Sequence, residues 1–188
     1  MFFDIMHGKK YSMATTWKID PAHSEISFKV NHLMITTVTG YFRVFEGQIV
    51  TEGDDFSTAS SIQFSADVGS IDTNHEERDI HLRSEEFFDA KRFSKLTFVG
   101  TRYDALSKNA TLQGNLTLKG VSRPISLDVE FAGEVKDPYG QHKAGFIISG
   151  KISRREFGLT WDAVTETGIP VVSDDVRLQA NVQVIKQV

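Results

Sequence analysis

The stretch SIDTNHEERDIHLRSEEFFDAKRFSKLTF, residues 70–98, decides how the rest of the chain is interpreted. It opens with the spacing of a helix capping box, in which Thr73 would accept hydrogen bonds from first-turn amides and Glu76 would reach back. We therefore predict a short helical insertion at about residues 73–88. Because its first turns contain few apolar residues, the helix should lie on the body of the protein rather than inside it.

The sequence on both sides of this insertion alternates with a period of two, which is typical of β-strands. Eight runs have one apolar face each, and mostly short connections with turn residues predict that consecutive runs are antiparallel neighbours. In the second run the phase changes between Val44 and Phe45, which indicates a bulge. The runs cover residues 26–30, 42–49, 62–68, 96–98, 112–118, 125–131, 144–152 and 176–184.

Eight such strands could close into a barrel or stack as a sandwich. Closure removes exposed strand edges, and glycines inside strands (Gly47, Gly114 and Gly150) suit the tight bends of a barrel. We therefore predict an all-β fold, an eight-stranded antiparallel barrel. It should form one domain over residues 15–188, with residues 1–14 as a peripheral N-terminal extension.

Composition excludes several classes of function. The chain of 188 residues carries a net charge of −4, which does not favour binding to nucleic acid or to anionic membranes. It has no cysteine, so disulfides, thiol nucleophiles and cysteine-ligated metals are excluded. The 14 phenylalanines far outnumber the 4 tyrosines and 2 tryptophans, and phenylalanine lines dry interiors without needing a hydrogen-bond partner.

No targeting signal stands out. The N-terminal segment MFFDIMHGKKYSMA places its lysines after a short apolar run, the reverse of a secretory signal, and no window is apolar enough to span a membrane. The prediction is a cytoplasmic protein, or a periplasmic one if the natural N-terminus differs. Met13 is a second plausible start of translation, so residues 1–12 are not expected to contribute to the fold.

No arrangement of residues predicts catalysis or metal binding. His75, Asp79 and His81 share the predicted helix, but a spacing of six residues turns the two histidines away from each other. Acidic residues fall mainly in loops or in the outward phase of strands, as on a solvated surface. We expect no catalytic residues, no metal and no cofactor, hence a protein that is not an enzyme.

Several blocks of sequence together resemble a known family. They are WKIDPAHSEISF at 17–28, GYFRVFEG at 40–47, IDTNHEERDIHLRS at 71–84 followed by Phe87 and Phe88, GNLTLKGVSRP at 114–124, Gly145-Phe146, and REFG at 155–158. On these residues, from Trp17 to Val184, the chain resembles the YceI-like family, bacterial lipocalin-like barrels that bind polyisoprenoids. The resemblance implies a long isoprenoid ligand, such as a polyprenyl compound or a quinone.

Candidate ligand-binding residues lie on the apolar phases of the predicted strands. An apolar tunnel would hold an alkenyl chain by burial of apolar area, with selectivity set by length and shape. Phe157 and Trp161, in or beside the long connection at 157–173, could border the mouth. The remaining candidates are Phe28, Val30, Phe42, Phe64, Phe88, Phe98, Leu116, Leu118, Leu127, Phe131, Phe146, Ile148 and Leu178.

Three functions remain open at this stage. The favoured one is non-catalytic carriage or sequestration of an isoprenoid lipid. The second is a filled barrel that acts in stress response through a protein partner, and every candidate residue would then be ordinary core. The third is an enzyme that modifies a lipid, which would need polar groups with perturbed pKa values at the cavity mouth. The sequence also leaves a homodimer open.

Overall fold

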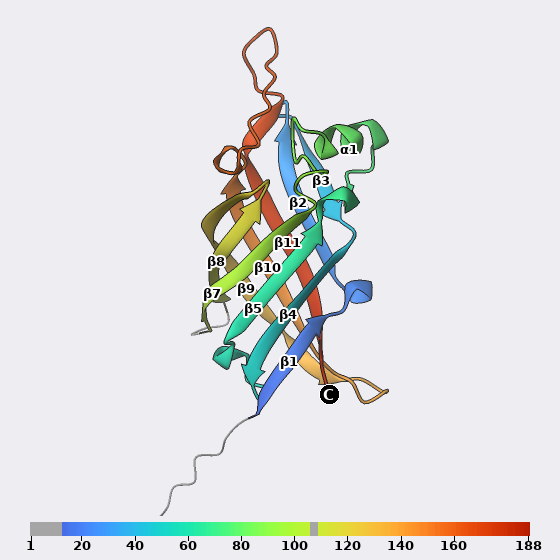
Figure 1. Ribbon diagram of the computed structural model, residues 1–188, viewed down its shortest axis with the longest axis vertical. Helices are drawn as coiled ribbons and strands as arrows, with labels where there is room; N and C mark the ends of the chain where they lie inside the picture. The colour runs from blue at the N-terminus through green and yellow to red at the C-terminus, as the bar shows by residue number, and fades with distance from the viewer. Residues whose placement is uncertain (1–12, 106–108) are drawn as a thin grey trace, which may run out of the picture.

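The computed structural model describes residues 13–105 and 109–188 (Figure 1). The predicted extension 1–14 lies outside the described residues except for Met13 and Ala14, and Ala14 already begins the first strand. Within the described ranges, no helix is both long and apolar enough to cross a lipid bilayer.

Most of the described chain is β-strand. The strands are β1 Ala14–Ile19, β2 Glu25–His32, β3 Thr36–Phe42, β4 Phe45–Glu52, β5 Ser61–Asp67, β6 Ile71–Asp72, β7 Lys95–Asp104, β8 Asn109–Leu118, β9 Val121–Lys136, β10 His142–Ser153 and β11 Val172–Lys186. The helix α1 spans Glu76–Arg83, and single 3₁₀ turns occupy Pro21–His23, Phe56–Thr58, Val68–Ser70 and Arg155–Phe157.

Eight of these strands close a ring in the order β1-β4-β5-β7-β8-β9-β10-β11, and β11 pairs back onto β1. All neighbours are antiparallel, with Trp17 opposite Lys186 at the seam that joins the two ends of the chain. The predicted eight-stranded antiparallel barrel is therefore confirmed. β2, β3 and β6 extend the same sheet beyond β11 at the end that lies uppermost in Figure 1, which we call the upper end.

These three additional strands exist because the first strands of the barrel are broken. β1 and β2 lie one after the other along the same edge of β11, separated by Pro21, which has no N–H to donate to the sheet. β3 and β4 are likewise separated at the predicted bulge, where the Ser70 hydroxyl accepts hydrogen bonds from the amides of Arg43 and Val44 at 3.1 and 3.0 Å. The sequence prediction began its first strand at residue 26 and missed β1.

The helix begins later than the capping box predicted. Its N-cap is His75, whose Nδ1 accepts from the amide of Arg78 at 3.3 Å. Thr73 cannot be the cap because its amide and hydroxyl both donate to the buried carboxylate of Asp79. Asn74 adopts a positive φ of 60°, which turns the chain before the helix starts. The rest of the predicted insertion forms turns rather than helix.

Candidate ligand-binding cavity

The barrel encloses an elongated cavity of about 260 Å³ with an almost entirely apolar wall. The wall follows β11 from Val172 to Val184. At about 3.3 Å per residue and a strand tilt of about 40°, this corresponds to roughly 30 Å along the barrel axis. A volume of this size spread over that length has room for one hydrocarbon chain but not for two side by side.

Twelve of the candidate residues predicted from strand phase lie in this wall. Neighbouring rings contact one another, with centroids 5.8 Å apart for Phe28 and Phe42 and 6.3 Å apart for Phe42 and Phe88. Contact of these residues with a ligand stays a prediction. The twelve are Phe28, Val30, Phe42, Phe64, Phe88, Phe98, Leu116, Leu118, Leu127, Phe146, Ile148 and Leu178.

The other three candidates lie outside the cavity wall. Phe131 is 42% exposed near the lower end, where its ring packs against Phe56 and Phe146. Phe157 is fully buried in the 3₁₀ turn after β10 and does not face the cavity. Trp161 is half-buried and covers the outside of the upper wall.

At the upper end, the segment that contains α1 completes the wall in place of a strand. Leu82, Phe87 and Phe88 line the cavity from this segment. The segment also contacts the neighbouring β8–β9 turn, because Lys119 of this turn donates to the Glu85 carbonyl at 3.0 Å. The helical insertion therefore forms a lid over the upper part of the cavity.

The connection between β10 and β11 meets this lid from the other side. The Trp161 ring packs against Phe87 with centroids 5.2 Å apart and meets the edge of the His81 ring at 5.5 Å. These contacts join two segments that are far apart in sequence and lie at the same end of the barrel (Figure 1).

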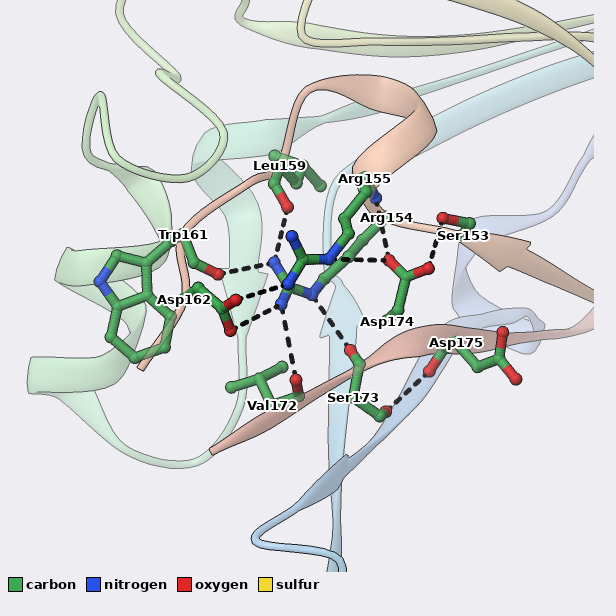
Figure 2. A network of polar contacts seen from close by, with 10 residues as sticks. All are labelled: Ser153, Arg154, Arg155, Leu159, Trp161, Asp162, Val172, Ser173, Asp174 and Asp175. Atoms are coloured by element: carbon green, nitrogen blue, oxygen red, sulfur yellow. Dashed lines mark hydrogen bonds and ion pairs between the residues drawn. The ribbon is translucent and has the colours of Figure 1, made fainter. Parts of the chain in front are cut away.

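A buried arginine holds the β10–β11 connection in place. Arg154 is 3% exposed and borders the cavity, and its guanidinium donates to backbone carbonyls on both sides of the connection (Figure 2). The acceptors are the carbonyls of Leu159 at 2.6 Å, Trp161 at 2.7 Å, Ser173 at 3.0 Å and Val172 at 3.5 Å. One side chain therefore fixes where the connection leaves the barrel and where it returns.

Three charged residues, Arg155, Asp162 and Asp174, surround the Arg154 guanidinium and affect its pKa. Burial lowers the pKa of Arg154 and the charge of Arg155 lowers it further, while Asp162 and Asp174 oppose the shift. Asp162 accepts from Arg155 at 2.6 Å, and the Ser153 hydroxyl donates to Asp174 at 2.7 Å (Figure 2). An arginine pKa lies so high that the side chain stays charged despite this lowering.

The lower end of the cavity is bounded by aromatic residues. Phe56 and Tyr103 line both the main cavity and a second pocket of about 350 Å³ that carries Asp54, Asp55 and Glu134. Burial raises the pKa of Tyr103. The two side chains form a partition between an apolar interior and an acidic outer pocket.

Sequence analysis missed several residues of the site. Leu82 and Phe87 stand in the insertion and follow no strand period, and Phe56 stands in a cluster of turn residues. No sequence pattern predicted that Arg154 is buried, because two adjacent arginines after a strand normally indicate a solvent-exposed surface. Its only sequence signal was its place directly before REFG at 155–158.

The cavity wall contains little that could perform chemistry. Among the described residues, Arg154 is the only charged residue of the wall, and its donors already meet backbone carbonyls. Within the same residues, no group of three or more His, Cys, Asp or Glu side chains is arranged to hold a metal ion.

Comparison with solved structures agrees with this architecture. The YceI protein of Campylobacter jejuni superposes with a TM-score of 0.71 at 31% identity, over 90% of this chain and 96% of that chain. BcnA of Burkholderia cenocepacia has a TM-score of 0.74 at 24% identity, over 88% of this chain and 98% of BcnA. A polyisoprenoid binding domain from Saccharophagus degradans shares the fold, with a TM-score of 0.63 at 16% identity over 91% and 98%.

Sequence comparison gives the same result. A UPF0312 protein of Staphylococcus epidermidis is 37% identical over 172 residues, which cover 90% of this chain and 96% of the relative. Protein YceI of Salmonella newport is 33% identical over 178 residues, which cover 94% of this chain and 90% of the relative. The model of the YceI-like domain matches residues 17–184. With matches that run through every barrel strand and the lid, the chain belongs to the YceI-like family.

Proposed function

We propose that this protein holds a long-chain isoprenoid lipid, such as a polyprenyl compound or an isoprenoid quinone, in the barrel cavity and carries or sequesters it without modifying it. The observation that carries the proposal is the cavity itself, which is elongated, one chain wide and almost entirely apolar along its length. The polyisoprenoid binding domain that shares this fold supports the same class of ligand.

The energetics are consistent with binding through the tail. Burial of several hundred Å² of apolar ligand surface contributes on the order of 10 kcal/mol at roughly 25 cal/mol per Å². Association and ordering consume a large part of this free energy, which leaves affinities of about micromolar or tighter. Because the wall offers hydrogen bonds almost nowhere, length and shape should determine selectivity, and no cofactor is needed.

The two alternative functions receive less support. A filled barrel that acts only through a protein partner needs no internal space, whereas this barrel contains about 260 Å³ of it. A lipid-modifying enzyme needs an acid, a base or a nucleophile near the ligand. The described wall has the hydroxyls of Ser27, Ser149 and Tyr103 but no carboxylate, histidine or lysine that could activate them as a general base.

The test combines native mass spectrometry of the purified protein, mass analysis of extracted lipid, and titration with long-chain quinones and polyprenols. We expect a stoichiometric adduct or, for protein without bound lipid, saturable binding. Absence of both would refute the proposal and favour the partner-binding barrel.

A matched pair of variants locates the binding site. Ala180 lines the cavity on β11, and Asn181 beside it faces outward and is exposed. Ala180→Phe should weaken ligand binding roughly tenfold or more. The added ring occupies space in the cavity that the ligand would otherwise fill, and a packed interior cannot expand to hold both. Asn181→Phe adds the same bulk outside and should leave binding unchanged. Thermal unfolding of both variants verifies that they are folded.

A further inference from the structure

The turn between β2 and β3 has an unusual composition for its backbone shape. The Ile35 amide donates to the His32 carbonyl at 3.1 Å, and the two residues between them, Leu33 and Met34, have φ values of 52° and 59°. Two left-handed residues in a tight hairpin are characteristic of a type I′ turn, which strongly prefers Asn and Gly. Here the turn consists of bulky apolar residues, which disfavour this backbone conformation.

Met34 and the next residue, Ile35, point into solvent instead of packing, while Leu33 is partly buried. Met34 is 58% exposed and Ile35 is 80% exposed. A strained backbone that displays large apolar groups stabilises neither the turn nor the core. Such an outlier suggests a function that needs apolar side chains at this position.

Further exposed apolar residues lie at the same end of the barrel. Val164 and Ile169, 63% and 42% exposed, belong to the β10–β11 connection, which reaches furthest at the upper end in Figure 1. The Leu33 amide donates to the Val171 carbonyl at 2.9 Å and ties this connection to the β2–β3 turn. Ile80 of α1, 57% exposed, adds a third protruding element. We call Met34, Ile35, Ile80, Val164 and Ile169 the upper rim.

The upper rim adjoins the end of the cavity. Val172, which follows the tied residue Val171, pairs with His32 at the base of the turn and lines the cavity. The lid residue Leu82 lies two positions from Ile80 in the same helix and also lines the cavity. The exposed apolar side chains therefore extend from the elements that enclose the upper part of the binding site.

The shape of the upper rim argues against a second copy of this chain as its occupant. Its five apolar side chains protrude from three separate segments, whereas a protein interface buries one continuous, closely packed face. Separate apolar protrusions suit a fluid partner that closes around each of them, as lipid does.

Local charge favours the same partner. Arg177 lies directly opposite Lys29 on one side and Lys151 on the other, so three basic residues form a row across β2, β11 and β10. Like charges directly opposite one another destabilise a sheet. Lys151 meets Asp175 at 3.0 Å, but no carboxylate in the described ranges lies within ion-pair distance of Lys29 or Arg177. This row complements anionic lipid headgroups on the sheet face beside the rim, whereas the rim segments themselves carry the carboxylates of Glu76, Glu77, Asp162 and Glu166.

We propose that the upper rim docks the protein on a lipid bilayer, with the β2–β3 turn inserted among the headgroups. This inference rests on the proposed function. Docking at this end would let an isoprenoid tail pass between the bilayer and the cavity without crossing water. Basic residues beside the rim would favour anionic bilayers over neutral ones.

The test is co-sedimentation with vesicles of phosphatidylcholine alone and of phosphatidylcholine mixed with phosphatidylglycerol. We expect binding to both, stronger with phosphatidylglycerol. Substitution of Met34→Ser with Ile35→Ser should weaken binding roughly tenfold. The matched control is Val135→Ser with Tyr139→Ser, which removes residues 61% and 92% exposed at the opposite end and should change nothing. Failure of the native chain to bind either vesicle, or an equal loss in both variants, would overturn the proposal.

A second variant separates function from folding. Leu33→Asn with Met34→Gly supplies the residues that a type I′ turn prefers, so it should raise the unfolding temperature while it weakens vesicle binding. Higher stability with unchanged binding would overturn docking. Docking would also be overturned by a rim variant that changes the oligomeric mass of the protein in sedimentation but leaves vesicle binding unchanged. The rim would then be an interface between protein chains.

Loading from detergent solution distinguishes this proposal from the proposed function. The rim variants should bind polyprenol presented in detergent as well as the native chain does, and should extract it from vesicles more slowly. A protein that docks on vesicles but takes up no polyprenol from either source would support docking and refute the lipid-carrying function. Equal extraction rates for native and rim variants would overturn docking.

Discussion

The two ends of the barrel are closed in different ways. At the lower end, strand pairs with strand, and the seam between β1 and β11 surrounds Trp17, which is fully buried and donates to the Thr51 hydroxyl at 3.0 Å. At the upper end the sheet is interrupted, and a helical lid and a long connection complete the wall. The difference teaches that one barrel can combine two kinds of closure, a continuous ring of paired strands at one end and a wall completed by a helix and a long connection at the other.

The chain's two tryptophans, one at each end, give the strongest test of this contrast. Trp17→Ala should lower the free energy of unfolding by about 4 kcal/mol, because it empties a packed site and removes a buried hydrogen bond. Trp161→Ala, at a half-buried position, should cost about 1–2 kcal/mol. Urea unfolding followed by far-ultraviolet circular dichroism measures both, and equal costs would contradict the division.

Arg154→Met should rank second. It leaves the carbonyls of Leu159, Trp161 and Ser173 without their donor, so we expect a loss of about 2–3 kcal/mol. Hydrogen exchange should accelerate in residues 158–171 and stay unchanged near Trp17. Arg155→Met, which alters a neighbouring guanidinium that is about half exposed, is the control and should have little effect. Faster exchange at both ends would show that the ends are not independent.

A smaller effect should appear in acid at the junction of β1 and β2. Burial alone would raise the pKa of Asp20, but hydrogen bonds with His23, the Ala22 amide and Gln183 outweigh burial and hold the pKa below its usual range. A lowered carboxyl pKa stabilises the fold above the unfolded value and loses this contribution as pH falls through the folded value. Asp20→Asn should therefore lower stability at neutral pH, and the loss should shrink in acid as the native carboxylate becomes protonated. Stability curves from pH 7 down to about pH 3 measure this, and a constant difference would contradict it.

Strand period predicted which side of the sheet a residue faces, and little more. It assigned Phe28, Phe98 and Leu178 to the interior because neighbouring side chains on a strand point to opposite faces. It could not assign height along the barrel axis. Phe131 shares the phase of Val129 in β9 but lies below the cavity, beyond the partition formed by Phe56 and Tyr103.

The lid and the buried arginine required information that local sequence does not contain. Phe87 lines the cavity because the insertion folds back across the upper end, and Arg154 is buried because carbonyls from two distant segments converge on it. Strand period did not predict β1 or the break at Pro21, and that β1 and β2 share one edge of β11 depends on the closed ring. The sequence blocks that contain or adjoin these features, at 17–28, 71–84 and 155–158, stood out through the family resemblance rather than through strand period.

The pairing of Trp17 with Lys186 also bears on how the protein is made. Synthesis delivers the first strand of the ring long before the last, so β1 and β10 must wait with unpaired edges while the phenylalanine-rich interior is open to its surroundings. Closure joins contacts of very high sequence separation, which makes it a slow, late step of folding. Until that step the open interior and the two unpaired edges leave the nascent chain vulnerable to aggregation.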